Sequence, residues 1–271
     1  MIGLLKDDCP SGTVPIRRTM KEDLIAIRSM SNNIYPQSAE HPGVHTAIIQ
    51  MLDLPDRSYT GVEGNIAVYN PDVKLGESYA EIHVINGAGD NTNAIITGWM
   101  IDGSRTTGCF NVYCPGFVQI DRRVHLGAPI SNVSVPYGPH FEIPISIFKE
   151  DDGNWWINYN GINVGYYPAN IFNNFTNPQI VGWGGIAVVP DPTTEISPPM
   201  GSGVFPDGKY EHSCSIRFVQ YRNNSGILDG PYGDYEKIID SPGCYSVADP
   251  VYRATQGYNF DFGGPGGKCV N

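Results

Sequence analysis

Long apolar runs are absent from this sequence of 271 residues. No stretch approaches the roughly 18 consecutive apolar residues that a membrane-spanning helix needs, so we expect no membrane partner. Basic residues are scarce: 17 Lys and Arg stand against 28 Asp and Glu, for a net charge of −11. Nucleic acids and anionic membranes are recognised by basic patches, so we expect no nucleic-acid partner either. The six histidines have no metal-ligand spacing, and we predict neither a metal nor a cofactor.

Helical periodicity is also nearly absent. The sequence has 32 Gly, 22 Pro and 16 Tyr, and its apolar runs are short, rich in Val, Ile, Phe and Tyr, and bounded by turn residues. This pattern is typical of many short strands and predicts an all-β fold, a β-sandwich of two packed antiparallel sheets. We predict strands at residues 44–50, 64–69, 78–85, 94–101, 116–122, 140–148, 155–159, 162–166, 180–189, 213–221 and 258–262.

The first 40 residues have a different character. Residues 19–30 are the one good helical stretch, in which Thr19 and Glu22 have the spacing of a capping box. Residues 31–43 are polar and broken by proline, as a linker is. We therefore divide the chain into an N-terminal segment, residues 1–40, and one β domain, residues 44–271.

Seven motifs carry a resemblance to a known family. They are CPSGTVPIRRTMKEDL (9–24), GCFNVYCPGFVQ (108–119), GNWW (153–156), VGYYP (164–168), VGWGG (181–185), MGSGVF (200–205) and NFDFGGPGGKC (259–269). In this order they resemble the neprosin family, which are secreted plant glutamic endopeptidases. The resemblance implies peptide hydrolysis by two glutamates, with peptides or proteins as partners, including proline-rich ones. It makes no prediction of the oligomeric state.

The two positions that the resemblance assigns to the catalytic glutamates are Ile96 and Ile186. An aliphatic side chain cannot transfer a proton, and a β-branched residue facing inward on a strand is ordinary core. Only eight residues, 100–107, separate two motifs between which the family has a longer segment. We therefore predict a neprosin-like pseudo-peptidase. The alternatives are a proline-directed endopeptidase that uses other acids, and a secreted module that binds peptides or cell-wall polysaccharide.

The resemblance also places the chain outside the cell. It implies that residues 1–40 are the end of an activation propeptide, that the signal peptide is missing from this chain, and that the full-length protein is secreted or in the cell wall. Three sequons, at Asn132, Asn174 and Asn223, agree with a glycoprotein. It implies two disulfides, Cys109–Cys114 and Cys244–Cys269, and leaves Cys9 and Cys214 over. A metal site at Cys109 and Cys114 is the alternative, but two further ligands are missing.

The sequence contains other acids that are candidate substitutes for the missing glutamates. Period-two alternation places Tyr79, Glu81 and His83 on one strand face, where Glu81 and His83 are either an acid/base pair or part of a hydrogen-bonded sheet surface. Asp102 and Glu195 are weaker candidates in predicted loops. Ser202, between two glycines, lacks the context of a serine nucleophile and is expected in a turn.

Aromatic side chains in the motif strands suggest a binding cleft. A β-sandwich with an aromatic groove can hold peptide or sugar by stacking and hydrogen bonding. Alternation sends about half of such a set into the core, and Trp155 and Trp156 must point to opposite faces. The candidates are Trp99, Trp155, Trp156, Tyr166, Tyr167 and Trp183.

Overall fold

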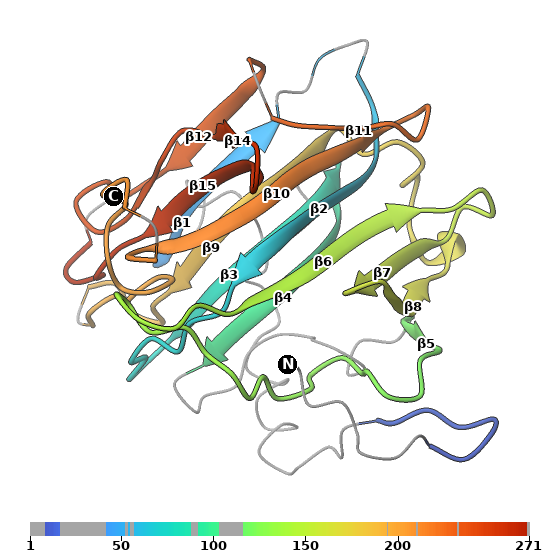
Figure 1. Cartoon of the computed structure of the whole chain (residues 1–271), viewed down its shortest axis with the longest axis horizontal. Coiled ribbons are helices and arrows are strands. Elements are labelled where there is room, and N and C mark those ends of the chain that lie inside the picture. The colour runs from blue at the N-terminus through green and yellow to red at the C-terminus, as the bar shows by residue number, and fades with distance from the viewer. Residues whose placement is uncertain are drawn as a thin grey trace.

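A computed structural model of the chain describes residues 9–16, 42–51, 54, 57–87, 92–102, 116–193, 195–209, 211–231 and 233–269. Over these ranges the regular elements are β-strands and one short 3-10 helix, η4 (Ala169–Ile171). The strands form two antiparallel sheets that pack face to face (Figure 1). The predicted all-β sandwich is therefore confirmed. The predicted helix at residues 19–30 and nearly all of the predicted linker lie outside the described residues.

The smaller sheet has five strands. In spatial order they are β12 (Tyr235–Ile239), β1 (Val44–Met51), β9 (Ile180–Val188), β3 (Glu77–Asn86) and β4 (Asn93–Asp102). Every neighbouring pair is antiparallel, and β9, from the middle of the sequence, lies between β1 and β3. The sheet thus depends on pairing between segments that are far apart in the chain.

The larger sheet has ten strands. Its path runs through β13 (Ser246–Val247), β15 (Gly257–Gly263), β10 (Cys214–Asn223), β2 (Tyr59–Ala67), β6 (Glu142–Lys149), β7 (Trp155–Tyr159), β8 (Ile162–Tyr167) and β5 (Val118–Gln119). Two short strands pair beside this path, β11 (Leu228–Asp229) on β10 and β14 (Val251–Arg253) on β15.

The core lies between the two sheets. It forms because every second side chain along a strand points toward the other sheet. On β6, Ile143, Ile145 and Ile147 point inward and are buried, while their neighbours are only half-buried. The indoles of Trp183 and Trp99 cross the core from the five-stranded sheet. Their Nε1 atoms donate to the β2 carbonyls of Glu63 at 2.9 Å and Ala67 at 2.8 Å. These two bonds link the sheets at fixed points, because each satisfies a polar group that burial would otherwise leave unpaired.

The observed strands differ from the predicted ones mainly at their ends. β2 begins at Tyr59 rather than at residue 64, and the strand predicted at 116–122 shortens to Val118–Gln119. The short strands β11, β12, β13 and β14 have no alternating apolar pattern and were not predicted. None of the helices in the described ranges is long and apolar enough to cross a membrane.

Candidate functional site

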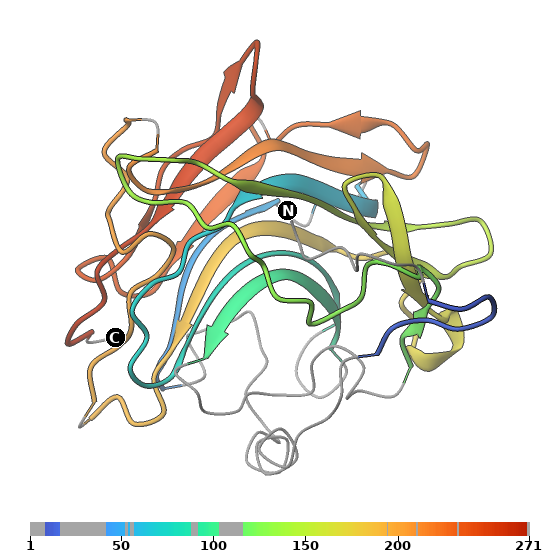
Figure 2. The ribbon, with the colours of Figure 1, turned by 60° about the horizontal axis from the view of Figure 1, so that its bottom comes forward.

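The outer face of the five-stranded sheet is concave. In Figure 2, strands β9, β3 and β4 curve in the same direction. The ten-stranded sheet lies on the convex side of this curve. Along β3, Ala80, Ile82 and Val84 belong to the core, so the alternate residues face away from it. We call this outer surface the concave face. Its central residues are Thr46, Ile48, Gln50, Tyr79, Glu81, His83, Ile96, Gly98, Met100, Gly182, Gly184 and Ile186.

Ile96 and Ile186 both lie on the concave face, on the two strands that flank β3. Ile186 on β9 pairs with Tyr79, and Ile96 on β4 pairs with His83. Glu81 lies between these two pairing positions on β3. The two isoleucines therefore lie on opposite sides of the strand that carries the one carboxylate at this point of the face.

The surroundings of Ile186 are those of a packed core residue. Its side chain is buried in a small apolar cluster with Val44 and Ile48, and the Ile238 side chain packs against that cluster. Ile96 is half-buried. A side chain in such surroundings contributes packing, and neither isoleucine offers an atom that can bind or transfer a proton.

Glu81 and His83 form a buried polar pair beside the isoleucines. His83 Nδ1 lies 3.2 Å from Glu81 Oε1, and the two residues are 0% and 3% exposed. A carboxylate oxygen is an acceptor, so this distance fits an Nδ1–H that donates to Glu81. Among the described residues, Nε2 of the same ring has no hydrogen-bond partner. The ring is thus fixed at one nitrogen and unsatisfied at the other.

Glycines make room for this pair. A Cβ atom at Gly182 would lie 2.4 Å from His83 Nε2, so any other residue there would collide with the imidazole. Glu81 is flanked across the neighbouring strands by Gly184 on β9 and Gly98 on β4. Gly98 is exposed, so the sheet beside Glu81 is open to solvent on that side.

A second polar pair continues the row that contains His83. Gln50 on β1 pairs with Gly182, and its Nε2 donates to Glu236 Oε1 on β12 at 2.9 Å. Gln50 and His83 therefore lie on either side of a position without a side chain. Sequence reasoning overlooked Gln50 and Gly182, because only the register of β1 with β9 brings them beside His83.

Three of the six candidate aromatic residues belong to the core. Trp99, Trp155 and Trp183 are at most 5% exposed and lie between the sheets. Each indole Nε1 donates to a main-chain carbonyl. These tryptophans do not face the concave face.

The other three candidates lie at the β7–β8 end of the ten-stranded sheet. Tyr167 packs inward against Phe117, with ring centroids 5.0 Å apart. Trp156 and Tyr166 pair across β7 and β8 and stack with centroids 4.8 Å apart. Phe148 on β6 pairs with Trp156, so these three half-buried rings form a row across the outer face of the ten-stranded sheet. Among the described residues, the buried Nε1 of Trp156 has no hydrogen-bond partner.

The weaker acid candidates and Ser202 are accounted for by local structure. Asp102 is the last residue of β4 and not part of a loop, which corrects the prediction. Glu195 closes a turn by accepting from the Asp191 main-chain nitrogen at 3.0 Å. Ser202 Oγ donates to the His212 carbonyl at 3.0 Å and so stabilises a turn. The sequence predicted the turn at Ser202, and neither Glu195 nor Ser202 is on a concave-face strand.

The cysteines divide between a disulfide and free thiols. Cys244 and Cys269, 25 residues apart, form the disulfide that the resemblance implies. Cys9 and Cys214 are free, and burial raises the pKa of the Cys214 thiol well above its ordinary value. Cys109 and Cys114 lie outside the described residues. Within the described ranges, no group of three or more His, Cys, Asp or Glu side chains is arranged to hold a metal ion.

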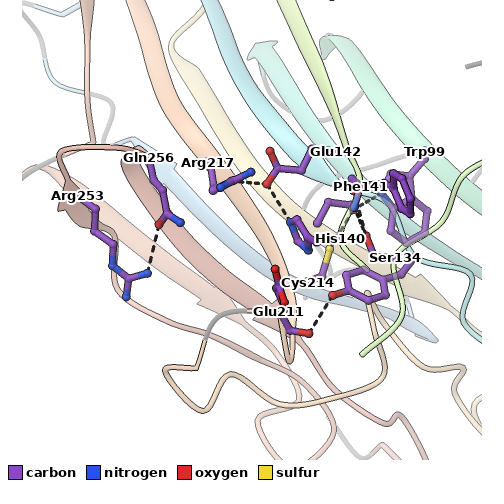
Figure 3. A network of polar contacts seen from close by, with 12 residues as sticks. Trp99, Ser134, His140, Phe141, Glu142, Glu211, Cys214, Arg217, Arg253 and Gln256 are labelled. Atoms are coloured by element: carbon purple, nitrogen blue, oxygen red, sulfur yellow. Dashed lines mark hydrogen bonds and ion pairs between the residues drawn. The ribbon is translucent and has the colours of Figure 1, made fainter. Parts of the chain in front are cut away.

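A separate polar cluster lies at the ten-stranded sheet (Figure 3). Glu142 accepts hydrogen bonds from His140 Nε2 at 3.0 Å and from Arg217 Nε. Burial raises the pKa of Glu142, but the bonds from His140 and Arg217 outweigh it and the net pKa is lowered. Asp261 on β15 behaves in the opposite way: burial is the main cause that raises its pKa to about 6. Sequence reasoning overlooked this cluster, although His140 and Glu142 have the same period-two spacing as Glu81 and His83.

Comparison with known families agrees with this architecture. A family model described as Neprosin matches residues 78–265, which is more than half of the chain. The match runs from β3 through β15 and includes Glu81, Ile96 and Ile186. The chain therefore belongs to the neprosin family.

Proposed function

We propose that this protein binds peptides on its concave face and does not hydrolyse them by the paired-carboxylate mechanism of its family. The observation that supports the proposal is the chemistry of Ile96 and Ile186. They occupy the two positions at which the resemblance expects glutamates, and both lie on the same face of one sheet, on either side of Glu81. Neither residue supplies an acid to that face.

The size of the expected loss follows from transition-state arithmetic. One general acid or base typically contributes about 10² to 10⁴ in rate. That factor corresponds to roughly 3 to 5 kcal/mol of activation free energy for each group. Loss of both groups leaves binding and the remaining polar side chains, so amide hydrolysis should fall to the background rate.

Secretion of the full-length protein is part of the same proposal. The Cys244–Cys269 disulfide supports it, since disulfides persist in oxidising compartments. The family membership supports it as well.

A second candidate function, glycan binding, is favoured by the aromatic row of the ten-stranded sheet. Phe148, Trp156 and Tyr166 lie on adjacent strands and face outward. Sugars stack on such rings. Titration with cellohexaose, compared between the parent and Trp156→Ala, tests this candidate, and the absence of saturable binding to the parent would reject it.

The test of the main proposal combines turnover and binding. The parent protein is incubated with fluorogenic proline-containing peptides between pH 3 and pH 7, and binding of the same peptides is measured by calorimetry. We expect saturable binding without cleavage. Cleavage that disappears in Glu81→Gln would instead establish the alternative, a peptidase that uses another acid.

A further inference from the structure

We propose that Asn174 carries an N-linked glycan and that the first sugar of this glycan sits in the pocket beside it. The inference rests on the proposed secretion, because such glycans are added in the secretory pathway. It adds the residue that is modified and the chemical group that the pocket holds.

Asn174 begins a sequon whose two reactive side chains reach solvent. The sequon, Asn174-Phe175-Thr176, lies in the connection between η4 and β9. The side chains of Asn174 and Thr176 are exposed, and neither forms a hydrogen bond with another described residue. Phe175 is 5% exposed and packs on Trp155, with ring centroids 5.1 Å apart. The acceptor amide and the hydroxyl that a sequon requires are therefore both accessible.

Hydrogen bonds hold the backbone of the sequon in place. Asn86 Nδ2 donates to the Asn174 carbonyl at 2.8 Å, and Trp155 Nε1 donates to the Phe175 carbonyl at 3.3 Å. Asn174 has a φ of 61°, a left-handed conformation that asparagine adopts more readily than most residues. The attachment point thus has a defined position, so a sugar bonded to it would meet the same neighbours in every molecule.

An open pocket of about 440 Å³ adjoins the Asn174 side chain. It is lined by Asn86, Gly87, Asn174, Thr176, Asn177 and Gln179. None of these lining side chains is charged, and amides both donate and accept hydrogen bonds. The hydroxyl and acetamido groups of N-acetylglucosamine do the same, so the pocket complements this sugar better than an ion or an apolar group. Asn177 is exposed and has no hydrogen bond with another described residue, so its amide is available to the sugar.

The other two sequons use their polar groups within the fold. Ser134, the third residue of the sequon at Asn132, is 4% exposed, and its hydroxyl donates to the Phe141 carbonyl at 3.0 Å. Asn223 Oδ1 accepts hydrogen bonds from two main-chain nitrogens of its own turn. Neither sequon lines the pocket. The folded surface therefore favours Asn174.

The modification transfers an oligosaccharide from a lipid diphosphate donor. Asn174 Nδ2 forms a bond to C1 of the first sugar, the C1–O bond to the phosphate breaks, and the lipid diphosphate leaves with the electron pair. Nδ2 loses one proton and keeps the other, and no oxidant or reductant is needed. The Asn174 main-chain carbonyl, which accepts from Asn86, is not involved, so the loop keeps its hydrogen bond.

Mapping of the secreted protein tests the site. The full chain is expressed behind a cleavable signal in a eukaryotic host that adds high-mannose glycans. Peptide N-glycosidase in H₂¹⁸O then converts each glycosylated asparagine to labelled aspartate. We expect the label at Asn174 in most molecules, its loss in Thr176→Ala, and its retention in Thr176→Ser, which keeps the sequon.

The outcomes of this mapping separate the site from secretion. Secreted parent without label at Asn174 overturns this inference alone, and so does label that persists in Thr176→Ala. Parent that the host retains and degrades instead of exporting overturns the proposed secretion and the inference with it.

Melting temperatures test the position of the sugar. Endoglycosidase H removes all of the glycan except the first N-acetylglucosamine. The trimmed parent should melt about 3 °C above Thr176→Ala, which lacks the sugar. Asn177→Ala should lower the Tm of the trimmed parent by about 2 °C and that of Thr176→Ala by less than about 1 °C. An equal shift in both backgrounds overturns the placement of the sugar in the pocket.

The matched control is the same pair of proteins without glycan. Parent and Thr176→Ala exported to the bacterial periplasm, where no such glycan is added, should melt within about 1 °C of each other. If they differ as much as the glycosylated pair does, the effect belongs to the Thr176 side chain and the placement of the sugar is wrong.

Discussion

A proton in transit needs an oxygen, nitrogen or sulfur atom, and the side chains of Ile96 and Ile186 contain none. What these residues supply instead is packing, most clearly at Ile186 against Val44 and Ile48. Two carboxylates held in a partly dehydrated site repel each other and lose hydration. Their replacement by aliphatic residues should therefore favour stability at the expense of proton transfer.

Placing glutamates at positions 96 and 186 should reverse this gain in stability. We expect Ile96→Glu with Ile186→Glu to lower the free energy of unfolding by roughly 3 kcal/mol at pH 7, because one charge would be added at a buried position and one at a half-buried position, both beside Glu81. The loss should be smaller near pH 4, where the acids can stay protonated. Urea unfolding measures the free energy of unfolding at the two pH values. The conservative pair Ile96→Val with Ile186→Val is the control, and a double glutamate variant more stable than the parent at pH 7 would contradict the argument.

Asp261 predicts a pH dependence of stability with a definite sign. Its pKa in the folded protein is raised to about 6, chiefly by burial, and an unfolded aspartate titrates near 3.9. The folded state thus prefers the protonated form. The stability that this group contributes is full below about pH 4 and is lost as the pH rises through about 6. Asp261→Asn should raise the free energy of unfolding by about 2 kcal/mol at pH 8 and leave it unchanged at pH 3.5.

Glu142 should behave in the opposite way. Its pKa is lowered by the hydrogen bonds from His140 and Arg217, which outweigh its burial. Its contribution is therefore present above the ordinary glutamate pKa and lost as the pH falls through the lowered value. Glu142→Gln should cost about 2 kcal/mol at pH 7 and much less near pH 3. If thermal melts give the same cost at both pH values, the effect is packing rather than charge.

At the scale of the element, the disulfide ties the strands at one end of the larger sheet. Cys244 precedes β13 and Cys269 follows β15, and these two strands pair. Replacing both cysteines by serine should lower the free energy of unfolding by about 3 kcal/mol, since the bridge closes a loop of 25 residues. Peptide mapping without reductant, which should recover the linked pair, gives the matched test. Free thiols at both positions in native protein would refute the bridge.

The sequence predicted strands well where apolar and polar residues alternate. It predicted them poorly where a strand depends on pairing with a neighbouring strand. β6 and β3 have a clear period of two, and both were found. β14 has three exposed residues and exists through its register with β15, which no local pattern records. The same limit applies to the site: Glu81 and His83 were identified from alternation along one strand. Gly182 and Gln50 required knowledge of how β1, β9 and β3 pair.

At the scale of the whole molecule, every described strand lies between Val44 and Gly263. The described N-terminal residues, 9–16, contact the sandwich near β5, where Gln119 Nε2 donates to the Pro15 carbonyl at 2.5 Å. We propose that residues 1–40 are a removable propeptide segment.

Proteolytic cleavage within residues 31–41 tests this division of the chain. The C-terminal product, which contains all of residues 44–271, should keep its far-UV spectrum and lose no more than about 4 °C in Tm, equivalent to about 1 kcal/mol for a domain of this size. An uncleaved sample carried through the same treatment is the control. Collapse of the fragment on cleavage would mean that the first 40 residues belong to the folding unit.

The strand order also has a consequence for biosynthesis. In the five-stranded sheet β1 pairs with β9 and β12, and in the ten-stranded sheet β10 pairs with β2 and β15. The five-stranded sheet is therefore complete only after residue 239 has been synthesised, and the ten-stranded sheet only after residue 263. Until then β1 and β10 each present an unpaired edge, and folding limited by such distant pairings is slow. The nascent chain should consequently require chaperone protection until synthesis is almost complete, however stable the finished sandwich is.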